Sequence, residues 1–146
     1  MKKLFIIISV IFFLSCNNGE YYQYYAEYSD FEKITNKRLT GWFPKIITND
    51  SYEIQSSSYL DICAFTSVKY KKLSSVDSIF NLYKSITVND FKITTAKYQS
   101  KIPNWFLPLE KIDDVNFEAV ELNKKLFALR EKKTNRIYSI SSIKYK

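Results

Sequence analysis

The side chains best suited to chemistry are a group of acids in the last third of the chain: Glu110, Asp113, Asp114, Glu118 and Glu121. Two carboxylates ~5 to 9 Å apart can hydrolyse a glycosidic bond, and carboxylate oxygens also bind calcium. Glu118, however, lies between two apolar residues of a predicted strand, and no loop spaces oxygen ligands as calcium requires. We therefore expect these acids on the solvated surface and predict no catalytic residue and no metal.

The chain contains no histidine and only two glycines, Gly19 and Gly41. The missing histidine removes the commonest general base near neutral pH and the commonest metal ligand. Two glycines cannot build a phosphate-binding loop or a dinucleotide fingerprint. We predict that the protein is not an enzyme and has no cofactor. An enzyme using carboxylates alone is a third hypothesis, which requires Asp113, Glu118 and Glu121 in one cleft.

The N-terminal segment predicts where the protein is found. Lys2 and Lys3 precede the apolar residues 4–13, a run too short for a permanent membrane helix of ~20 residues and therefore a targeting segment. Leu14, Ser15 and Cys16 follow. This pattern resembles the export signal of bacterial lipoproteins, although Phe13 stands where that family prefers leucine. The alternative is a plain secreted or singly anchored protein.

The resemblance implies that residues 1–15 are a signal peptide and that Cys16 is the lipidation site, through which the protein contacts the membrane. In a Gram-negative cell the next residue guides sorting, and Asn17 is not the aspartate that commonly retains lipoproteins at the inner membrane. The implied location is the cell envelope, with the outer membrane favoured in a Gram-negative cell. We expect residues 16–30 to form the lipidated cysteine and a tether. Residues 31–146 then form a single domain, since the mature chain has the size of one.

Cys63 would be left without a partner if Cys16 carries the lipid, which excludes a disulfide-stapled fold. A lone cysteine without a histidine to activate it is expected to be a small buried hydrophobe. The basic residues are mostly scattered lysines, with three arginines in the whole chain. Nucleic-acid binders concentrate such charges on one face, so we predict no nucleic-acid partner. A weak attraction to anionic lipid or polymer is the alternative.

Aromatic residues supply the candidate binding site. Trp42 and Trp105 each lie close to a phenylalanine and a proline, and exposed rings there could stack on a sugar or cover a hydrophobic partner. Rings at such corners can equally form the core. The candidate binding residues are Trp105, Phe106 and Trp42. Of the two tryptophans, we expect Trp42 in the core and Trp105, in a proline-bracketed loop, on the surface.

Periodicity of apolar residues predicts the elements that must position these side chains. The expected strands are residues 59–70, 91–98, 115–122, 125–131 and 136–143, with a short helix from residue 49 and an amphipathic helix over residues 76–84. In the first strand Val68 should face the core and Lys69 the solvent. We predict the α+β class, with a mostly antiparallel sheet of four to five strands and one or two helices packed on one face.

Five tyrosines lie within residues 21–28. Next to a lipid anchor they could sit among the lipid headgroups, but we favour a first strand or helix packed on the domain. Residues 41–44, Ile54 and the Leu60-Asp61 pair resemble a pattern of small uncharacterised bacterial proteins. That likeness covers about twenty residues and implies a shared structural or binding feature around Trp42 and Asp61, without a known activity.

The first functional hypothesis is a membrane-anchored, non-enzymatic domain of the cell envelope that binds a protein or an envelope component. The second is an immunity or inhibitor protein that neutralises an exported toxin or hydrolase. A compact, histidine-free, lipid-anchored domain suits the second role, and the genomic neighbourhood would separate the two hypotheses.

Overall fold

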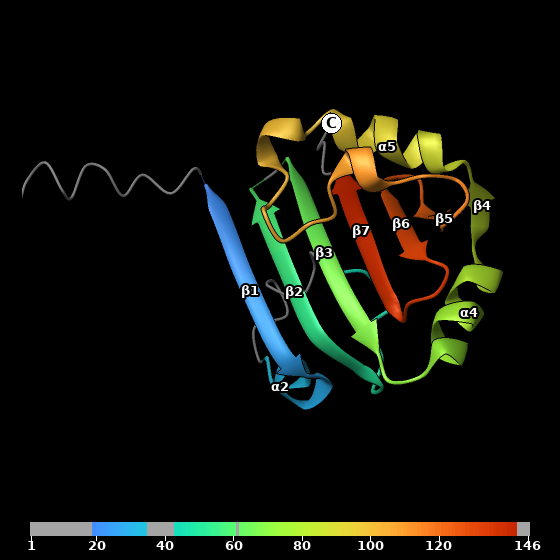
Figure 1. The fold of residues 1–146 in the computed structure, drawn as a ribbon. Helices are drawn as coiled ribbons and strands as arrows, with labels where there is room; N and C mark the ends of the chain where they lie inside the picture. Colours follow the sequence, from blue (N-terminus) through green and yellow to red (C-terminus); the bar gives the residue numbers. More distant parts are fainter. Residues whose placement is uncertain (1–18, 35–42, 61, 143–146) are drawn as a thin grey trace, which may run out of the picture.

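The computed structural model describes residues 19–34, 43–60 and 62–142. Its strands form one antiparallel sheet in the order β1-β2-β3-β7-β6-β5-β4 (Figure 1). The strands are β1 (Glu20–Glu27), β2 (Ser51–Tyr59), β3 (Cys63–Tyr70), β4 (Lys84–Ile86), β5 (Phe117–Asn123), β6 (Leu126–Glu131) and β7 (Arg136–Ser142). The α+β class is confirmed, but the sheet has seven strands in the described residues rather than four or five.

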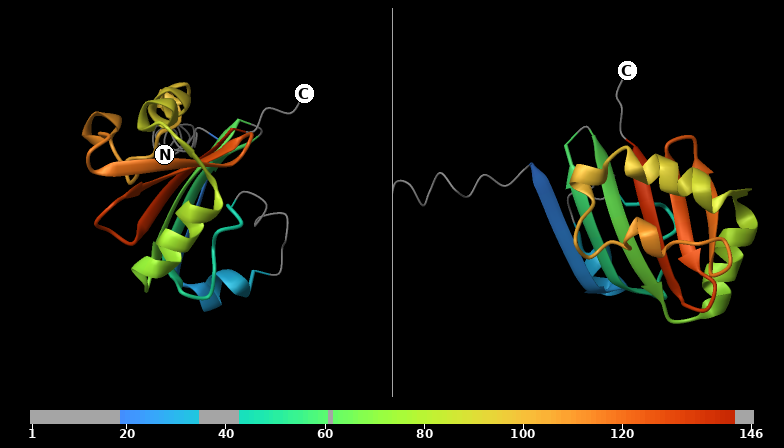
Figure 2. Two further views of the ribbon diagram at one scale, coloured as in Figure 1. Left: turned by 90° about the vertical axis from the view of Figure 1, so that its right-hand side faces the viewer. Right: turned by 45° about the horizontal axis from the view of Figure 1, so that its top comes forward.

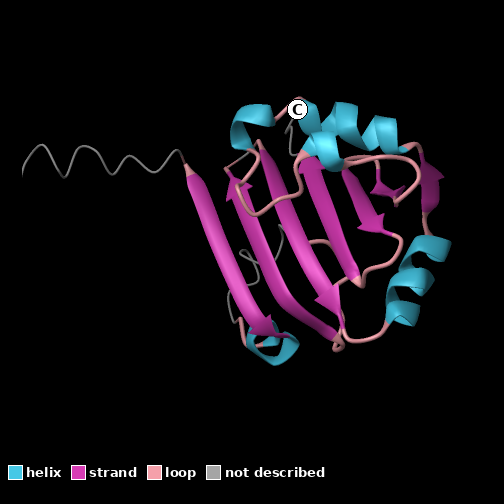
Figure 3. Ribbon diagram, in the orientation of Figure 1, coloured by secondary structure: helices cyan, strands magenta, loops and turns pink. Residues whose placement is uncertain are grey.

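Three α-helices and two short 3-10 helices complete the described elements (Figure 3). They are α2 (Tyr28–Glu32), α4 (Leu73–Leu82), α5 (Val88–Ala96), η1 (Gln99–Lys101) and η2 (Leu109–Lys111). None of these described helices has the length and apolar character needed to cross a membrane.

Helices lie on both faces of the sheet, with α5 on one side and α4 on the other (Figure 2). On the face covered by α5, the buried core includes Cys63, Phe65, Phe91, Phe106 and Leu129. On the face covered by α4, it includes Ile54, Val68, Tyr70, Val76 and Phe80. The prediction of helices on a single face was wrong, because the central strands carry apolar side chains on both faces and each face must be covered.

The C-terminal half of the sheet follows the sequence pattern closely. Strands β5, β6 and β7 form the predicted antiparallel meander, since short polar connections join neighbouring strands. Helix α4 is also confirmed, with Val76 and Phe80 buried one turn apart. The meander and α4 are joined by Arg130 of β6, which pairs with Asp77 of α4 at 2.5 Å and also with Glu118 of β5.

Three local predictions were wrong. The short helix expected from residue 49 is instead strand β2 from Ser51 onward. The strand predicted at residues 59–70 is shorter, because Tyr59 ends β2, a turn follows in which the Ile62 N–H bonds to the Tyr59 carbonyl, and β3 begins at Cys63. The predicted strand at residues 91–98 is mostly helix α5. That helix begins with a capping box, in which Thr87 Oγ1 accepts from the Asp90 N–H and Asp90 accepts from the Thr87 N–H.

The tyrosine-rich segment is the edge strand β1, which confirms the favoured interpretation of a packed strand. Its residues pair in register with β2 from Glu20 opposite Tyr59 to Glu27 opposite Tyr52. Residues 20–32 therefore belong to the folded domain rather than to the predicted tether. Gly19, just before the strand, has φ +67°, a conformation that glycine adopts without strain.

Candidate functional site

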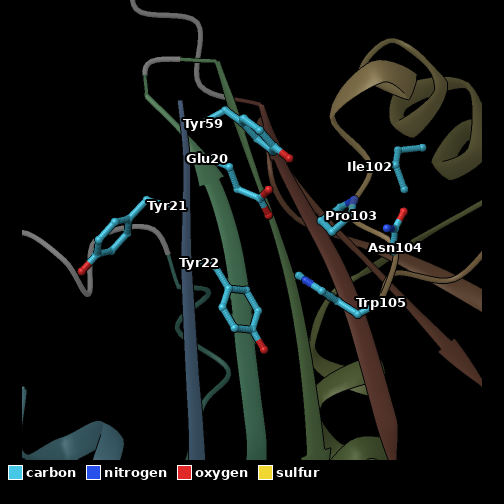
Figure 4. Close-up of a pocket in the computed structure, with 8 residues that line it drawn as sticks. All are labelled: Glu20, Tyr21, Tyr22, Tyr59, Ile102, Pro103, Asn104 and Trp105. Atoms are coloured by element: carbon cyan, nitrogen blue, oxygen red, sulfur yellow. The ribbon is translucent and has the colours of Figure 1, made fainter. Parts of the chain in front are cut away.

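A groove with a volume of about 700 Å³ lies between the start of β1 and the loop that follows η1 (Figure 4). It is lined by Glu20, Tyr21, Tyr22, Tyr59, Ile102, Pro103, Asn104 and Trp105. Figure 4 shows Glu20, Tyr22 and Tyr59 on the side of the sheet that faces the loop, whereas the ring of Tyr21 points away. One wall therefore comes from the sheet and the other from the proline-bracketed loop.

The loop is held by a buried aromatic residue. Phe106 is 3% exposed, and its ring packs edge-on against Phe65 and Tyr138 with centroid distances of 5.1 and 5.4 Å. A turn closed by the Phe106 N–H and the Pro103 carbonyl precedes it. Burial of Phe106 fixes the adjacent Trp105 at the groove, where it is half-buried.

Trp105, Ser57 and Glu20 form a chain of hydrogen bonds across the groove floor. The Trp105 Nε1–H donates to Ser57 Oγ at 3.2 Å. Ser57 Oγ in turn donates to Glu20 Oε1 at 2.5 Å. Because the three residues come from the loop, β2 and β1, this chain couples the edge strand to the loop and orients the Glu20 carboxylate.

Tyr59 closes the end of the groove near the β2–β3 turn. Burial, together with the nearby Glu20 carboxylate, raises the pKa of the Tyr59 hydroxyl to about 12, so the hydroxyl is protonated at neutral pH. The ammonium of Lys101 lies 4.9 Å from the centre of the Tyr59 ring, a cation–π distance. The groove thus combines aromatic surface, one carboxylate and a neutral hydroxyl.

Cys63 lies beneath this region and is buried. Burial raises the pKa of its thiol to about 11, against a smaller lowering effect of Lys101. The thiol is therefore protonated at neutral pH, and the thiolate is the reactive form. The predicted structural role of Cys63 agrees with this position.

The acids considered at the outset do not meet in a cleft. Asp113 caps a turn by accepting from the backbone N–H groups of Val115 and Asn116. Glu118 pairs with Arg130, and Glu121 lies 3.7 Å from Lys84. Residues three apart in a strand point to opposite faces, which separates Glu118 from Glu121. Within the described residues, acidic and cysteine side chains form no group of three that could hold a metal ion.

The candidate binding residues have different positions. Trp105 lines the groove, whereas Phe106 is core and cannot offer its ring as a contact surface. Trp42, Asp61 and Cys16 lie outside the described residues. Sequence reasoning missed Glu20, Tyr22 and Tyr59 as groove residues. Reading β1 as a strand would have placed Glu20 and Tyr22 on one face, but not opposite Trp105.

Comparison with known families gives one partial match. A family model for the YbbD head domain matches residues 23–75, about a third of the chain, extending from β1 into α4. Searches among curated proteins and among solved structures gave no match. The chain is thus similar to a YbbD head domain over residues 23–75, which include Tyr59 of the groove. The other groove residues, Trp105 among them, lie outside the matched residues.

Proposed function

We propose that this protein is a non-enzymatic binding domain, anchored in the cell envelope through Cys16, whose ligand occupies the groove between β1 and the 102–105 loop. The observation that carries the proposal is the groove itself, in which exposed aromatic surface lies beside an oriented carboxylate. Small-molecule and protein-binding sites typically combine apolar walls with a few placed polar groups.

The residues of the groove support binding of a protein or an envelope component. Tyr22 is 52% exposed, and tyrosine is enriched at interfaces because an apolar ring ends in a polar hydroxyl. Glu20 contributes a charge, and Asn104 an exposed amide.

Affinity capture of the full, lipid-intact chain from membranes tests this proposal, with Tyr22→Ala as the test variant. Tyr24→Ala is the matched control, because Tyr24 is 51% exposed on the same strand and does not line the groove. We expect the protein or envelope polymer recovered with the parent and with Tyr24→Ala to be lost with Tyr22→Ala, while both variants keep the parent melting temperature.

Equal recovery with Tyr22→Ala would overturn the groove as the binding site. The identity of the recovered partner also separates the two hypotheses. An exported toxin or hydrolase would favour the immunity or inhibitor role, and a structural envelope component would favour the binding role.

A further inference from the structure

We propose that the outer edge of β1, which no other described strand pairs with, binds an extended segment of a partner protein as an additional strand of the sheet. This inference rests on the proposed function, because it takes the ligand to be a protein whose strand runs beside the groove. It concerns the backbone edge, which the groove proposal does not use.

The two edges of the sheet differ in their protection. Among the described strands, β1 pairs only with β2 and β4 pairs only with β5 (Figure 1). Natural edge strands avoid unwanted pairing by being short or by carrying lysine or proline. Strand β4 has three residues and starts with Lys84. Strand β1 has eight residues, Glu20–Glu27, with neither lysine nor proline, and is therefore open to strand addition.

Hydrogen bonds elsewhere in the sheet establish which groups of β1 face outward. The Tyr59 carbonyl accepts from Ile62 in the β2–β3 turn, so the backbone of Tyr59 faces β3. Backbone groups alternate between the two sides of a strand, so Ser58 faces β1 and its register partner Tyr21 faces β2. The N–H and C=O groups of Tyr22 and Tyr24 consequently point to the open edge.

The same alternation is supported from the other side of β3. The Tyr70 N–H bonds to the Asn135 carbonyl, next to β7, so every second residue from Tyr70 back to Ala64 faces β7. The intervening residue Phe65 then faces β2, where it pairs with Ser57. Both arguments lead to the same result: the backbone N–H and C=O of Tyr22 form no hydrogen bond with the described strands. These groups can therefore bond to the backbone of an added strand.

The side chains along this edge indicate the chemistry of the partner. Tyr22 is half-exposed on the face that carries the groove, and cross-strand pairs of aromatic with β-branched residues stabilise sheets. Glu20, at the start of the strand, accepts from Ser57 and has no cation within ion-pairing distance in the described part of the chain. A segment with β-branched residues and a lysine or arginine near Glu20 is complementary.

A synthetic eight-residue peptide of alternating valine and threonine, with lysine at the end that meets Glu20, tests the edge directly. Its binding to the full chain in detergent micelles is measured by fluorescence anisotropy. Tyr24→Pro removes the outward N–H without removing a bond to β2, and proline is tolerated on such edges. Tyr24→Ala removes the same ring but keeps the N–H.

We expect Tyr24→Pro to weaken peptide binding about tenfold relative to Tyr24→Ala, as loss of a backbone hydrogen bond and a steric block predict. Replacing the peptide lysine by glutamate should weaken binding about threefold. Hydrogen exchange of the unmutated chain gives a readout that needs no variant: the peptide should slow exchange of the Tyr22 and Tyr24 amides.

Unchanged exchange at these two amides, or equal affinity of Tyr24→Pro and Tyr24→Ala, would overturn strand addition. A dimer in analytical ultracentrifugation that Tyr24→Pro abolishes would also overturn it, because a second copy of the chain would then occupy the edge. Loss of captured ligand with Tyr22→Ala but no slowed exchange would leave the groove proposal standing alone, so the two failures are distinguishable.

Discussion

Trp105 and Ser57 lie 48 residues apart in the sequence, and the indole N–H of Trp105 donates a 3.2 Å hydrogen bond to the Ser57 hydroxyl. The Ser57 hydroxyl in turn donates a hydrogen bond to the Glu20 carboxylate, although Glu20 lies on the neighbouring strand β1. A residue that sequence analysis placed in a surface loop is therefore also a structural link between the loop and the sheet. Its ring and its N–H have separable roles.

The two roles of Trp105 predict a graded loss of stability. Trp105→Phe keeps an aromatic ring next to Phe106 and removes the N–H, so it should lower the free energy of unfolding by about 1 kcal/mol. Trp105→Ala also removes the ring and should cost about 3 kcal/mol. Urea denaturation checks both values. Equal losses would show that the hydrogen bond, and not ring packing, dominates.

Val68 of β3 and Val115, in the turn before β5, compare a buried valine with an exposed one. Val68 is 1% exposed and Val115 is 79% exposed. Val68→Asp should lower the free energy of unfolding by about 4 kcal/mol, because an unpaired carboxylate is buried. Val115→Asp should change it by less than about 0.5 kcal/mol. Similar thermal melts of the two variants would contradict the buried position of Val68.

Lys69, which was predicted to face the solvent, is not a neutral control for Val68, because its ammonium pairs with Glu53 at 2.7 Å.

Arg130 should anchor helix α4 to the sheet. Its guanidinium pairs with Asp77 and Glu118 and lies 4.7 Å from the centre of the Phe80 ring. Arg130→Ala should lower the free energy of unfolding by about 2 kcal/mol, a value kept moderate because both carboxylates are partly solvated. Lys33→Ala, which breaks an exposed pair with Asp30, should have an effect near zero. Chemical denaturation measures both effects, and equal losses of stability in the two variants would contradict the anchoring role.

Stability should fall at alkaline pH. The pKa of Tyr59 is raised to about 12 and that of Cys63 to about 11, in each case chiefly by burial. The unfolded chain ionises these groups near their ordinary values of about 10 and about 8.5. Their contribution is thus complete below pH ~8.5 and is lost as the pH rises through ~11 to ~12. Urea midpoints between pH 8 and 12 measure this loss.

Tyr59→Phe is the matched variant for the alkaline loss, because it removes one of the titrating hydroxyls and keeps the ring that stacks with Lys101. The fall of the urea midpoint should be shallower between pH ~10 and ~12 in this variant. Curves of identical slope would show that Tyr59 ionises equally in the folded and unfolded states.

The predicted location in the cell envelope depends on lipidation of Cys16. Cys16→Ser should move the protein from the membrane to the soluble or unprocessed fraction, because acyl chains anchor a protein at ~0.8 kcal/mol per buried methylene. Fractionation and incorporation of labelled fatty acid check the prediction. An unlabelled native protein that still fractionates with membranes would exclude lipidation.

Local patterns in the sequence were sufficient where one short segment carries the whole signal. Alternation over β5, β6 and β7, with polar turns between them, predicted the meander, and the spacing of Val76 and Phe80 predicted α4. The α+β class follows from these elements. The same reasoning failed for α5, where alternation over residues 91–98 suggested a strand and the capping box of Thr87 and Asp90 was the stronger signal.

Only the tertiary structure decided how distant segments meet. The pairing of β1 with β2, the covering of both faces and the position of Trp105 opposite Glu20 join residues far apart in the chain, and no local period encodes such contacts. Strand β2 is an example. It contains the buried serines Ser56, Ser57 and Ser58, and serine is a residue type typical of turns, so the sequence alone does not predict a buried strand there. Composition excluded histidine and glycine-loop chemistry, whereas the groove and the position of β1 at the end of the described sheet exist only because the sheet brings distant segments together.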